Sequence, residues 1–242
     1  MKKIIVKNGK IPKIADNVAC IGYFDGVHRG HQALIKVAKD LSRMNGLKSM
    51  VICFNPDPND IIFKKRNKHI HSYSDRLDYF EEMGVDIVCV VEFTEELMKL
   101  EPEVFIEEFL MKMNINTLVC GYDFSFGNMG KGNSELLSSN LNTVVVEEVS
   151  YYKKKISSTR IKEAIQKGNY RLVNNLLGHN YRLKLKVIGY ENGRYKCECI
   201  DDSLLLPKKY DNGTLSYRDG YFYLKSKEKL ETGSTFPYKF LD

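Results

Sequence analysis

Two histidines three positions apart, His28 and His31, are the residues of this sequence best suited to chemistry on an anion. They belong to CIGYFDGVHRGHQALI (20–35), in which an apolar run ends near Phe24 and a helical pattern begins near Gly30. The first turn of a helix offers free N–H groups and the positive end of its dipole, and such a corner binds phosphate. We expect both imidazoles to face the surface and the same anion there, with Gly30 leaving room for a ligand beside the backbone.

Two other interpretations of this pair stay open on the residues alone. A metal site is the first, but it needs a third ligand and none stands nearby in the sequence. The second is a capping turn with two incidental histidines, which is the commoner origin of an isolated HxxH pattern.

Two further segments carry side chains that could bind phosphate or line a ligand pocket. Ser157-Ser158-Thr159 precedes a helical pattern, so its hydroxyls and N–H groups form a second anion-binding corner or only a helix cap. GYDFSFG (121–127) follows an apolar run and combines a carboxylate with two aromatic rings. Phe126 fits a hydrophobic core and the wall of a ligand pocket equally well.

Alternating apolar and amphipathic segments between residues 18 and about 150 predict the elements that position these groups. Several of the apolar runs are nearly continuous, as parallel strands covered on both faces require. We therefore expect an α/β domain with a doubly wound, mostly parallel sheet and ligands at the carboxyl ends of its strands. The predicted strands are 17–24, 48–54, 85–93, 115–124 and 143–150, and the predicted helices are 31–44, 72–83, 101–113, 158–168 and 170–179.

The pattern changes after Tyr181, where apolar and polar residues alternate with period two. Asn192-Gly193 between two such runs is a strong signal for a β-hairpin, and Asn212-Gly213 and Asp219-Gly220 are further turn signals. We predict domains at 1–180 and 181–242, the second a small antiparallel β module. A module of this size depends on packing against the first domain.

The segment GYFDGVHRGH resembles the GxFDGVHxGH pattern of the prokaryotic FAD synthetases, which are HxGH nucleotidyltransferases. Such a domain usually forms the N-terminal half of bifunctional riboflavin kinase/FMN adenylyltransferases. The resemblance covers about residues 15 to 180, because three more segments match in order: FNPDP (54–58), GYDFSFG (121–127) and ISSTRIKEAIQKGN (156–169).

The resemblance implies a Rossmann-like FMN adenylyltransferase that uses Mg²⁺, with ATP and FMN as substrates and FAD and pyrophosphate as products. It implies catalytic roles at the phosphates for His28, His31, Ser158, Thr159 and Lys162. It implies ATP contacts at Gly22, Phe24, Asp25, Gly30 and Asp123, with Asp123 also near magnesium. It implies flavin contacts at Asn55, Pro56, Asp57 and Phe126.

Two positions depart from the family pattern. The family has FxPHP where this chain has FNPDP, so Asp57 brings a charge and, at neutral pH, no hydrogen-bond donor. The motif SSTxxR ends in Lys162, which keeps the charge and loses the bidentate fork of arginine. We therefore also consider an HxGH enzyme with another phosphorylated acceptor, and a non-catalytic flavin- or nucleotide-binding regulator.

The C-terminal module resembles a truncated riboflavin kinase barrel without the segment that the kinase needs. Family kinases hold nucleotide phosphate and magnesium with a GFPTAN-like segment. After residue 180 the only prolines are Pro207 and Pro237, and neither precedes Thr-Ala-Asn. We therefore expect no riboflavin kinase activity.

The composition, 43% hydrophobic and 28% charged over 242 residues, excludes a disordered chain. The net charge of +6 suits anionic ligands, and also suits no partner at all. No basic face interleaved with aromatics indicates nucleic acid binding. No apolar run approaches the roughly 18 residues of a membrane span, and Lys7 and Lys10 interrupt the first apolar stretch too early for a signal peptide. We expect a cytoplasmic protein with no membrane partner.

The six cysteines carry no paired spacing typical of a zinc site. Four lie far apart in separate apolar runs, whereas Cys197 and Cys199 share one face of a predicted strand and cannot readily bridge each other. We expect reduced, mostly buried thiols.

Overall fold

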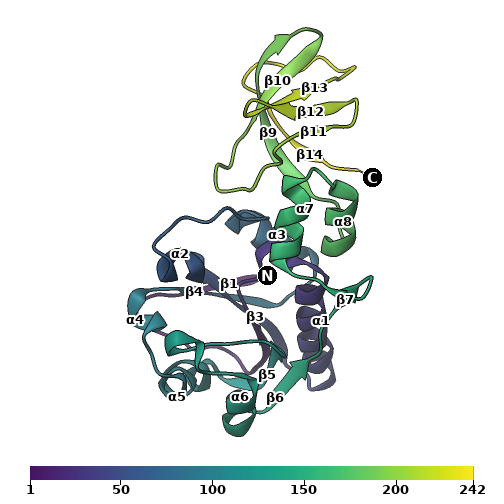
Figure 1. Cartoon of the computed structure of the whole chain (residues 1–242). Coiled ribbons are helices and arrows are strands. Elements are labelled where there is room, and N and C mark those ends of the chain that lie inside the picture. Colours follow the sequence, from purple (N-terminus) through teal and green to yellow (C-terminus); the bar gives the residue numbers. More distant parts are fainter. Residues whose placement is uncertain (242) are drawn as a thin grey trace. The chain divides into compact units, whose positions relative to one another are not determined.

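The computed structural model describes residues 1–241 and divides them into two compact units (Figure 1). The first unit is Met1–Asn67 with Tyr73–Lys155, and the second is Lys68–Ser72 with the described part of Ile156–Asp242. The units thus divide between Lys155 and Ile156, whereas the functional boundary at residue 180 stays a prediction.

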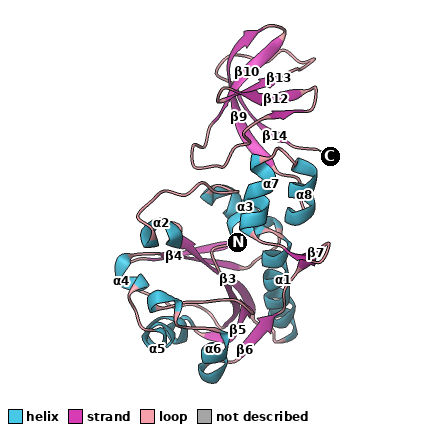
Figure 2. Cartoon of the chain, in the orientation of Figure 1, coloured by secondary structure: helices cyan, strands magenta, loops and turns pink. Residues whose placement is uncertain are grey.

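The first unit contains a six-stranded sheet in which every neighbouring pair is parallel (Figure 2). Its strands are β1 (Lys2–Val6), β2 (Asn17–Ile21), β3 (Lys48–Asn55), β4 (Ile87–Glu92), β5 (Ile115–Gly121) and β6 (Thr143–Val146), and a small separate hairpin is formed by β7 (Ser150–Tyr151) and β8 (Lys154–Lys155). The sheet order β1-β4-β3-β2-β5-β6 has the crossovers of a doubly wound fold, so the predicted fold class is confirmed.

Helices cover both faces of this sheet (Figure 1). They are α1 (Arg29–Met44), α2 (Pro58–Ile62), α3 (Tyr73–Glu82), α4 (Glu95–Met98), α5 (Pro102–Phe105) and α6 (Ser134–Asn140), with 3₁₀ turns η1 (Asp25–Val27), η3 (Met111–Met113) and η4 (Asn128–Gly130) and the π-helical turn η2 (Ile106–Leu110). Alternate residues of β2 show the two layers. Ala19 and Ile21 pack in the cluster that contains α5 and η2, and Val18 and Cys20 pack in the cluster that contains α1 and α3. Burial on both faces explains the continuous apolar runs.

The edge strand β1 is absent from the sequence-based prediction. It pairs in parallel with β4, from Lys2 opposite Ile87 to Val6 opposite Val91. Only Ile4 and Val6 are buried, while Lys2, Lys3 and Ile5 are exposed. Such a half-buried edge strand keeps polar residues on its open face. The segment therefore has no continuous apolar run by which the sequence would predict a strand.

Because all six strands are parallel, their carboxyl ends meet at one edge of the sheet. Segment 22–31 follows β2, segment 54–58 closes β3 and segment 121–127 follows β5. Three of the four predicted motifs therefore extend from the same edge, where doubly wound folds bind ligands.

The second unit joins two helices to an antiparallel sheet of order β11-β12-β13-β10-β9-β14. Its elements are α7 (Ser158–Gln166), α8 (Tyr170–Leu177), β9 (Arg182–Glu191), β10 (Arg194–Cys199), β11 (Tyr210–Asp211), β12 (Leu215–Arg218), β13 (Tyr221–Leu224) and β14 (Thr235–Lys239). Asn192 and Gly193 turn between β9 and β10 with φ of 50° and 75°, as a type I′ hairpin requires. The predicted β module is confirmed.

All six cysteines are free thiols, and five are buried, as predicted. Burial raises the pKa of Cys53, Cys120 and Cys197 to about 11, which makes these thiols poor nucleophiles. Among the described residues no helix is long and apolar enough to cross a membrane.

Asn174 on α8 supplies a test of how the second unit is held together. Its Nδ2 donates to the Phe240 carbonyl at 2.8 Å, and its Oδ1 accepts from the Tyr181 N–H at 2.8 Å. We predict that Asn174→Leu lowers the free energy of unfolding by roughly 2–4 kcal/mol, since two buried main-chain groups lose their partners. Chemical denaturation measures this. Asn175→Leu is the control and should cost much less, because among residues 1–241 the Asn175 amide bonds only the Arg171 carbonyl of its own helix.

Candidate active site

The corner between β2 and α1 is a strained turn that ends in a capped helix. Phe24, Gly26 and Val27 have φ of 61°, 83° and 41°, and a positive φ is costly for a β-branched valine. Gln32 Nε2 steadies the turn by donating to the Val27 carbonyl at 2.8 Å. His28 is the N-cap of α1, and its Nδ1 accepts from the His31 N–H at 3.4 Å.

The two imidazoles of this corner are stacked and fixed by their neighbours. Their ring centroids lie 3.6 Å apart with the planes 15° from parallel, and Phe24 stands edge-on to His31 at 5.2 Å. His28 is only 6% exposed, and the Nδ1 atom of His31 is buried with no hydrogen-bond partner among residues 1–241. The expectation of two surface-facing imidazoles is therefore wrong for His28, which the capping bond and the ring stack hold inside the protein, whereas His31 is partly buried.

Burial keeps both imidazoles neutral. It lowers the pKa of His28 to about 4, with Lys155 acting in the same direction and Asp25 opposing it. It also holds the pKa of His31 well below its usual range, helped by His28 and Arg76. Neutral imidazole keeps one N–H donor, so at pH 7 the pair can donate to an anion without carrying charge.

The glycines and Phe24 of this corner have clear steric roles. A Cβ on Gly30 would lie 3.2 Å from the His28 ring, so glycine leaves space for the imidazole. A Cβ on Gly22 would lie 3.3 Å from the Phe24 ring. Phe24 is fully buried and supports His31, and Asp25 is 4% exposed beside them. The structure thus brings together Gly22, Phe24, Asp25, His28, Gly30 and His31.

The turn after β5 carries an exposed ion pair. Asp123 accepts from Lys155 Nζ, which also lies 4.9 Å from the centre of the Tyr122 ring. The bond to Asp123 raises the pKa of Lys155, so its ammonium is charged. The same ammonium acts on His28. Asp123 and His28 therefore share one neighbouring cation.

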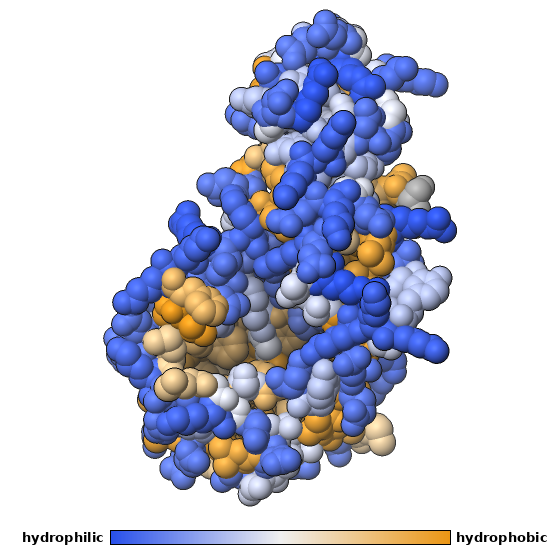
Figure 3. Space-filling view, in the orientation of Figure 1, coloured by the Kyte–Doolittle hydropathy of each residue, from blue (hydrophilic) through white to orange (hydrophobic). Residues whose placement is uncertain are grey.

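A cavity of about 680 Å³ opens at the same sheet edge and is mainly apolar. A hollow with an apolar lining is visible on this face of the first unit in Figure 3. The lining includes five phenylalanines, which are Phe54, Phe93, Phe105, Phe124 and Phe126. The volume suits a small organic ligand, and the rings suit a flat aromatic one.

Phe126 both packs in the core and lines this cavity. It is 8% exposed, and its ring centroid lies 5.5 Å from Phe105 and 5.8 Å from Phe124. A Cβ on Gly132 would lie 2.7 Å from the Phe126 ring, so that glycine lets the loop pass over it.

Comparison with known proteins identifies the family. The FAD synthetase family model matches residues 10–160. The chain belongs to the FAD synthetase family. It is 34% identical over 186 residues to a bifunctional riboflavin kinase/FMN adenylyltransferase of Listeria monocytogenes and 35% identical over 187 residues to that of Bacillus subtilis. Each match covers 74% of this chain and 59% of the relative, so the chain spans about three-fifths of these relatives' length.

A solved structure from Streptococcus pneumoniae, described as a macrolide-efflux protein, shares the fold over nearly the whole chain. The TM-score is 0.87 at 25% identity, and the match covers 99% of this chain and 90% of the other.

The FNPDP segment, where this chain departs from the FAD synthetase pattern, lies beside the cavity. Asn55, Pro56 and Asp57 do not line it, whereas Phe54 and Pro58 on either side do. Asp57 is 4% exposed and is the N-cap of α2, where its Oδ1 accepts from the Asn59 N–H at 2.9 Å. Asp57 therefore acts on the cavity by holding α2, whose last residue, Ile62, lies in its wall.

Sequence reasoning missed most of the phenylalanine wall. Phe54 lies in β3 and Phe93 directly follows β4, so their places at strand ends were a usable signal. Phe105 comes from α5, and only the folded chain shows that it reaches the cavity.

The second motif corner belongs to the other unit. Ser157 caps α7 by accepting from the Arg160 N–H at 3.3 Å, so the predicted capping corner is present. Ser158 and Thr159 open the helix, and Lys162 stands one turn beyond Ser158 on the same side. Their contact with phosphate stays a prediction.

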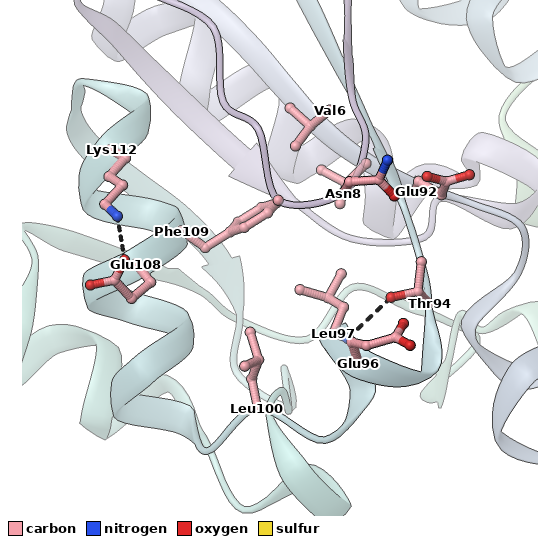
Figure 4. Close-up of a pocket in the computed structure, with 12 residues that line it drawn as sticks. Val6, Asn8, Glu92, Thr94, Glu96, Leu97, Leu100, Glu108, Phe109 and Lys112 are labelled. Carbon is pink, nitrogen blue, oxygen red and sulfur yellow. Dashed lines mark hydrogen bonds and ion pairs between the residues drawn. The ribbon is translucent and has the colours of Figure 1, made fainter.

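A second cavity, of about 510 Å³, lies past the carboxyl ends of β1 and β4 (Figure 4). Glu92, Glu96 and Glu108 line it, and its one lysine, Lys112, is paired with Glu108. The carboxylates of Glu92 and Glu96, which this lysine does not offset, repel an anionic substrate. Phosphates are therefore expected at the histidine corner and not in this cavity.

The buried His28 imidazole predicts how stability depends on pH. The His28 pKa is about 4 in the folded protein and near 6.5 when unfolded, so its contribution is present above pH 6.5 and is lost as the pH falls through 4. The loss is on the order of 3 kcal/mol. We predict that His28→Asn, which keeps a capping oxygen, flattens this decline. Denaturation between pH 7 and 4 measures it, and an equal decline in both proteins would contradict the assignment.

Proposed function

We propose that this chain transfers the adenylyl group of ATP to FMN, giving FAD and pyrophosphate. The observation that supports this most strongly is a juxtaposition within the first unit. A phosphate-type corner with two neutral imidazoles and a phenylalanine-lined cavity both open at the carboxyl edge of one parallel sheet. Membership of the FAD synthetase family agrees with both parts.

The proposed reaction needs no protein nucleophile. An FMN phosphate oxygen attacks the α-phosphorus of ATP, a P–O bond forms, and the bond to the β-phosphate oxygen breaks with its electron pair leaving on pyrophosphate. Catalysis then depends on alignment of the two phosphates and on stabilising the charge of the transferring group. The buried thiols, with their raised pKa values, offer no competing nucleophile.

His28 and His31 are the groups that we assign to the ATP phosphates. Neutral N–H donors fixed by stacking lose little freedom when the anion arrives, and such preorganised donors act most strongly as charge develops. Gly22, Phe24, Asp25 and Gly30 keep the turn in shape around them. We assign Ser158, Thr159 and Lys162 to the phosphate chain as well, with Lys162 offering charge without a bidentate fork.

Asp123 is the side chain that we assign to magnesium. A carboxylate oxygen at the sheet edge is a ligand that Mg²⁺ prefers, and the ion would neutralise phosphate charge. Asp123 is 54% exposed and is paired with Lys155, so binding the ion requires it to exchange partners. The freed ammonium would then stand beside His28 as a cation for phosphate.

The phenylalanine-lined cavity is the site that we assign to the flavin ring. A flat isoalloxazine between Phe54, Phe126 and their neighbours would bury apolar surface and stack on aromatic faces. Asn55, Pro56 and Asp57 would shape this end of the site through the chain between β3 and α2.

One observation favours a second candidate function, which is that of an HxGH nucleotidyltransferase with another phosphorylated acceptor. The buried cap Asp57 stands where the family pattern has histidine, so the wall beside α2 differs in charge. The experiment is incubation with MgATP and either FMN or other phosphorylated acceptors, followed by separation of the products. FAD with FMN supports the proposal; binding of flavin without turnover would indicate a non-catalytic regulator.

We predict that changing both histidines abolishes FAD formation. His28→Asn with His31→Gln preserves the helix cap and most of the packing, so the protein should fold. Loss of a single preorganised donor typically costs ~10²–10³ in rate, and loss of both should cost more. Turnover with FMN and MgATP, together with a melting curve, tests this. A folded double variant with near-normal turnover would remove the histidines from the mechanism.

The Asp57→His change is predicted to alter the apparent affinity for FMN more than that for ATP. Histidine is a poorer N-cap than aspartate, so α2 loosens beside the cavity at a cost of about 1 kcal/mol. The Michaelis constants for FMN and for ATP measure the two effects separately. Equal changes in both, or none, would show that α2 does not shape the flavin site.

We also predict that the chain does not phosphorylate riboflavin. The β module contains no GFPTAN-like segment between residues 181 and 242. With MgATP and riboflavin alone, no FMN should accumulate beyond the blank. FMN above the blank would mean that the module is a kinase with other phosphate-binding residues.

A further inference from the structure

Arg76 on α3 is a buried guanidinium with few partners. It is 3% exposed, and its one hydrogen bond among the described residues runs from Nη1 to the Tyr23 carbonyl at 2.7 Å. Its Nε is buried and unpaired. The guanidinium also lies 4.3 Å from the centre of the Tyr23 ring.

No ion pair joins this guanidinium to a carboxylate of residues 1–241, although Asp57, Asp25 and Asp60 act on the same Tyr23 side chain from farther away. A buried charge without a counter-charge is costly, and proteins usually pair it or place it where an anion will bind. The carbonyl and the ring of Tyr23 offset only part of that cost, since neither carries a full negative charge.

The position of Arg76 links it to the phosphate corner. Tyr23 opens the turn that leads to His28, and Arg76 also acts on His31, whose Nδ1 is buried without a partner. An unpaired imidazole nitrogen and a cation without an ion pair among the described residues therefore occur at one corner. The other charged side chains that act on the pair are Asp25 and Lys155, of opposite sign.

We propose that Arg76 is a positioning residue for this corner: its buried positive charge, which no ion pair holds among the described residues, draws the phosphates of ATP onto His28 and His31. The inference rests on the proposed function, because it takes the phosphates at this corner to be those of ATP. It supplies the charge that two neutral imidazoles lack. Arg76 itself touches no substrate, because it is buried beneath the turn.

A purely structural role makes a different prediction. If Arg76 only clamps Tyr23, its loss disturbs the flavin cavity, because Tyr23 lines that cavity. Flavin binding would then weaken as much as ATP binding. If its charge matters, binding of phosphate-bearing ligands should weaken, whereas binding of riboflavin, which carries no phosphate, should not.

The test is calorimetric binding of MgATP, pyrophosphate and riboflavin, the flavin that carries no phosphate, to the full chain carrying Arg76→Met or Arg76→Lys. Methionine removes the charge and lysine keeps it. Arg43→Met is the control, since Arg43 is an exposed cation of α1 paired with Asp40 at 3.9 Å. We expect Arg76→Met to weaken MgATP and pyrophosphate about tenfold or more, as one charge at partly screened range does. Riboflavin should change less than about twofold, and Arg76→Lys should restore most of the affinity.

Equal weakening of MgATP and riboflavin, or equal loss in the methionine and lysine variants, would overturn the proposal. So would unchanged affinity for both phosphate ligands. If Arg76→Met does not fold, the wild-type protein with ¹⁵N-labelled arginine is titrated with pyrophosphate. The Arg76 Nε resonance should then shift on saturation, and no shift would overturn the proposal. If the wild-type protein binds pyrophosphate but forms no FAD, the proposed function fails, and the binding measurements still decide the role of Arg76.

Discussion

The stacking of the buried His28 imidazole on the partly buried His31 imidazole, at the N-terminus of α1, is the constraint on which the rest of the site depends. Burial makes the pair neutral, with the pKa of His28 at about 4, so the corner offers N–H donors but no charge. In the proposed reaction, catalysis would also depend on the fold, because Phe24, Gly30 and the strained turn after β2 all hold these rings. The positive charge that phosphates require must come from other side chains, and Lys155 and Arg76 are the cations that act on the pair.

The two halves of the site have opposite physical character. The corner after β2 offers polar main-chain groups and neutral donors, whereas the cavity bounded by Phe54, Phe105 and Phe126 excludes charge. Parallel strands bring the corner and the cavity together at one edge of the sheet. This arrangement suits the proposed reaction, in which an adenylyl group is transferred to the phosphate of a substrate with an aromatic ring. The neighbouring acidic cavity shows that the edge is not uniformly attractive to anions.

Periodicity and motif spacing in the sequence predict the parallel sheet, the antiparallel module and the position of the corner. β1 escapes this reasoning because an edge strand with two buried side chains has no continuous apolar run. The burial of His28 escapes it because a ring stack depends on side-chain packing. The cap at Asp57 and the contribution of Phe105 to the cavity need contacts between elements, which spacing along the chain does not encode.

A crystal structure of the protein soaked with FAD tests the central claim most directly. FAD carries both halves of the proposed product, so a single density map locates the ring and the phosphates together. We predict an isoalloxazine ring between Phe54 and Phe126, and pyrophosphate oxygens within hydrogen-bond distance of His28 and His31. A flavin ring elsewhere, or phosphates away from the histidine corner, would contradict the account.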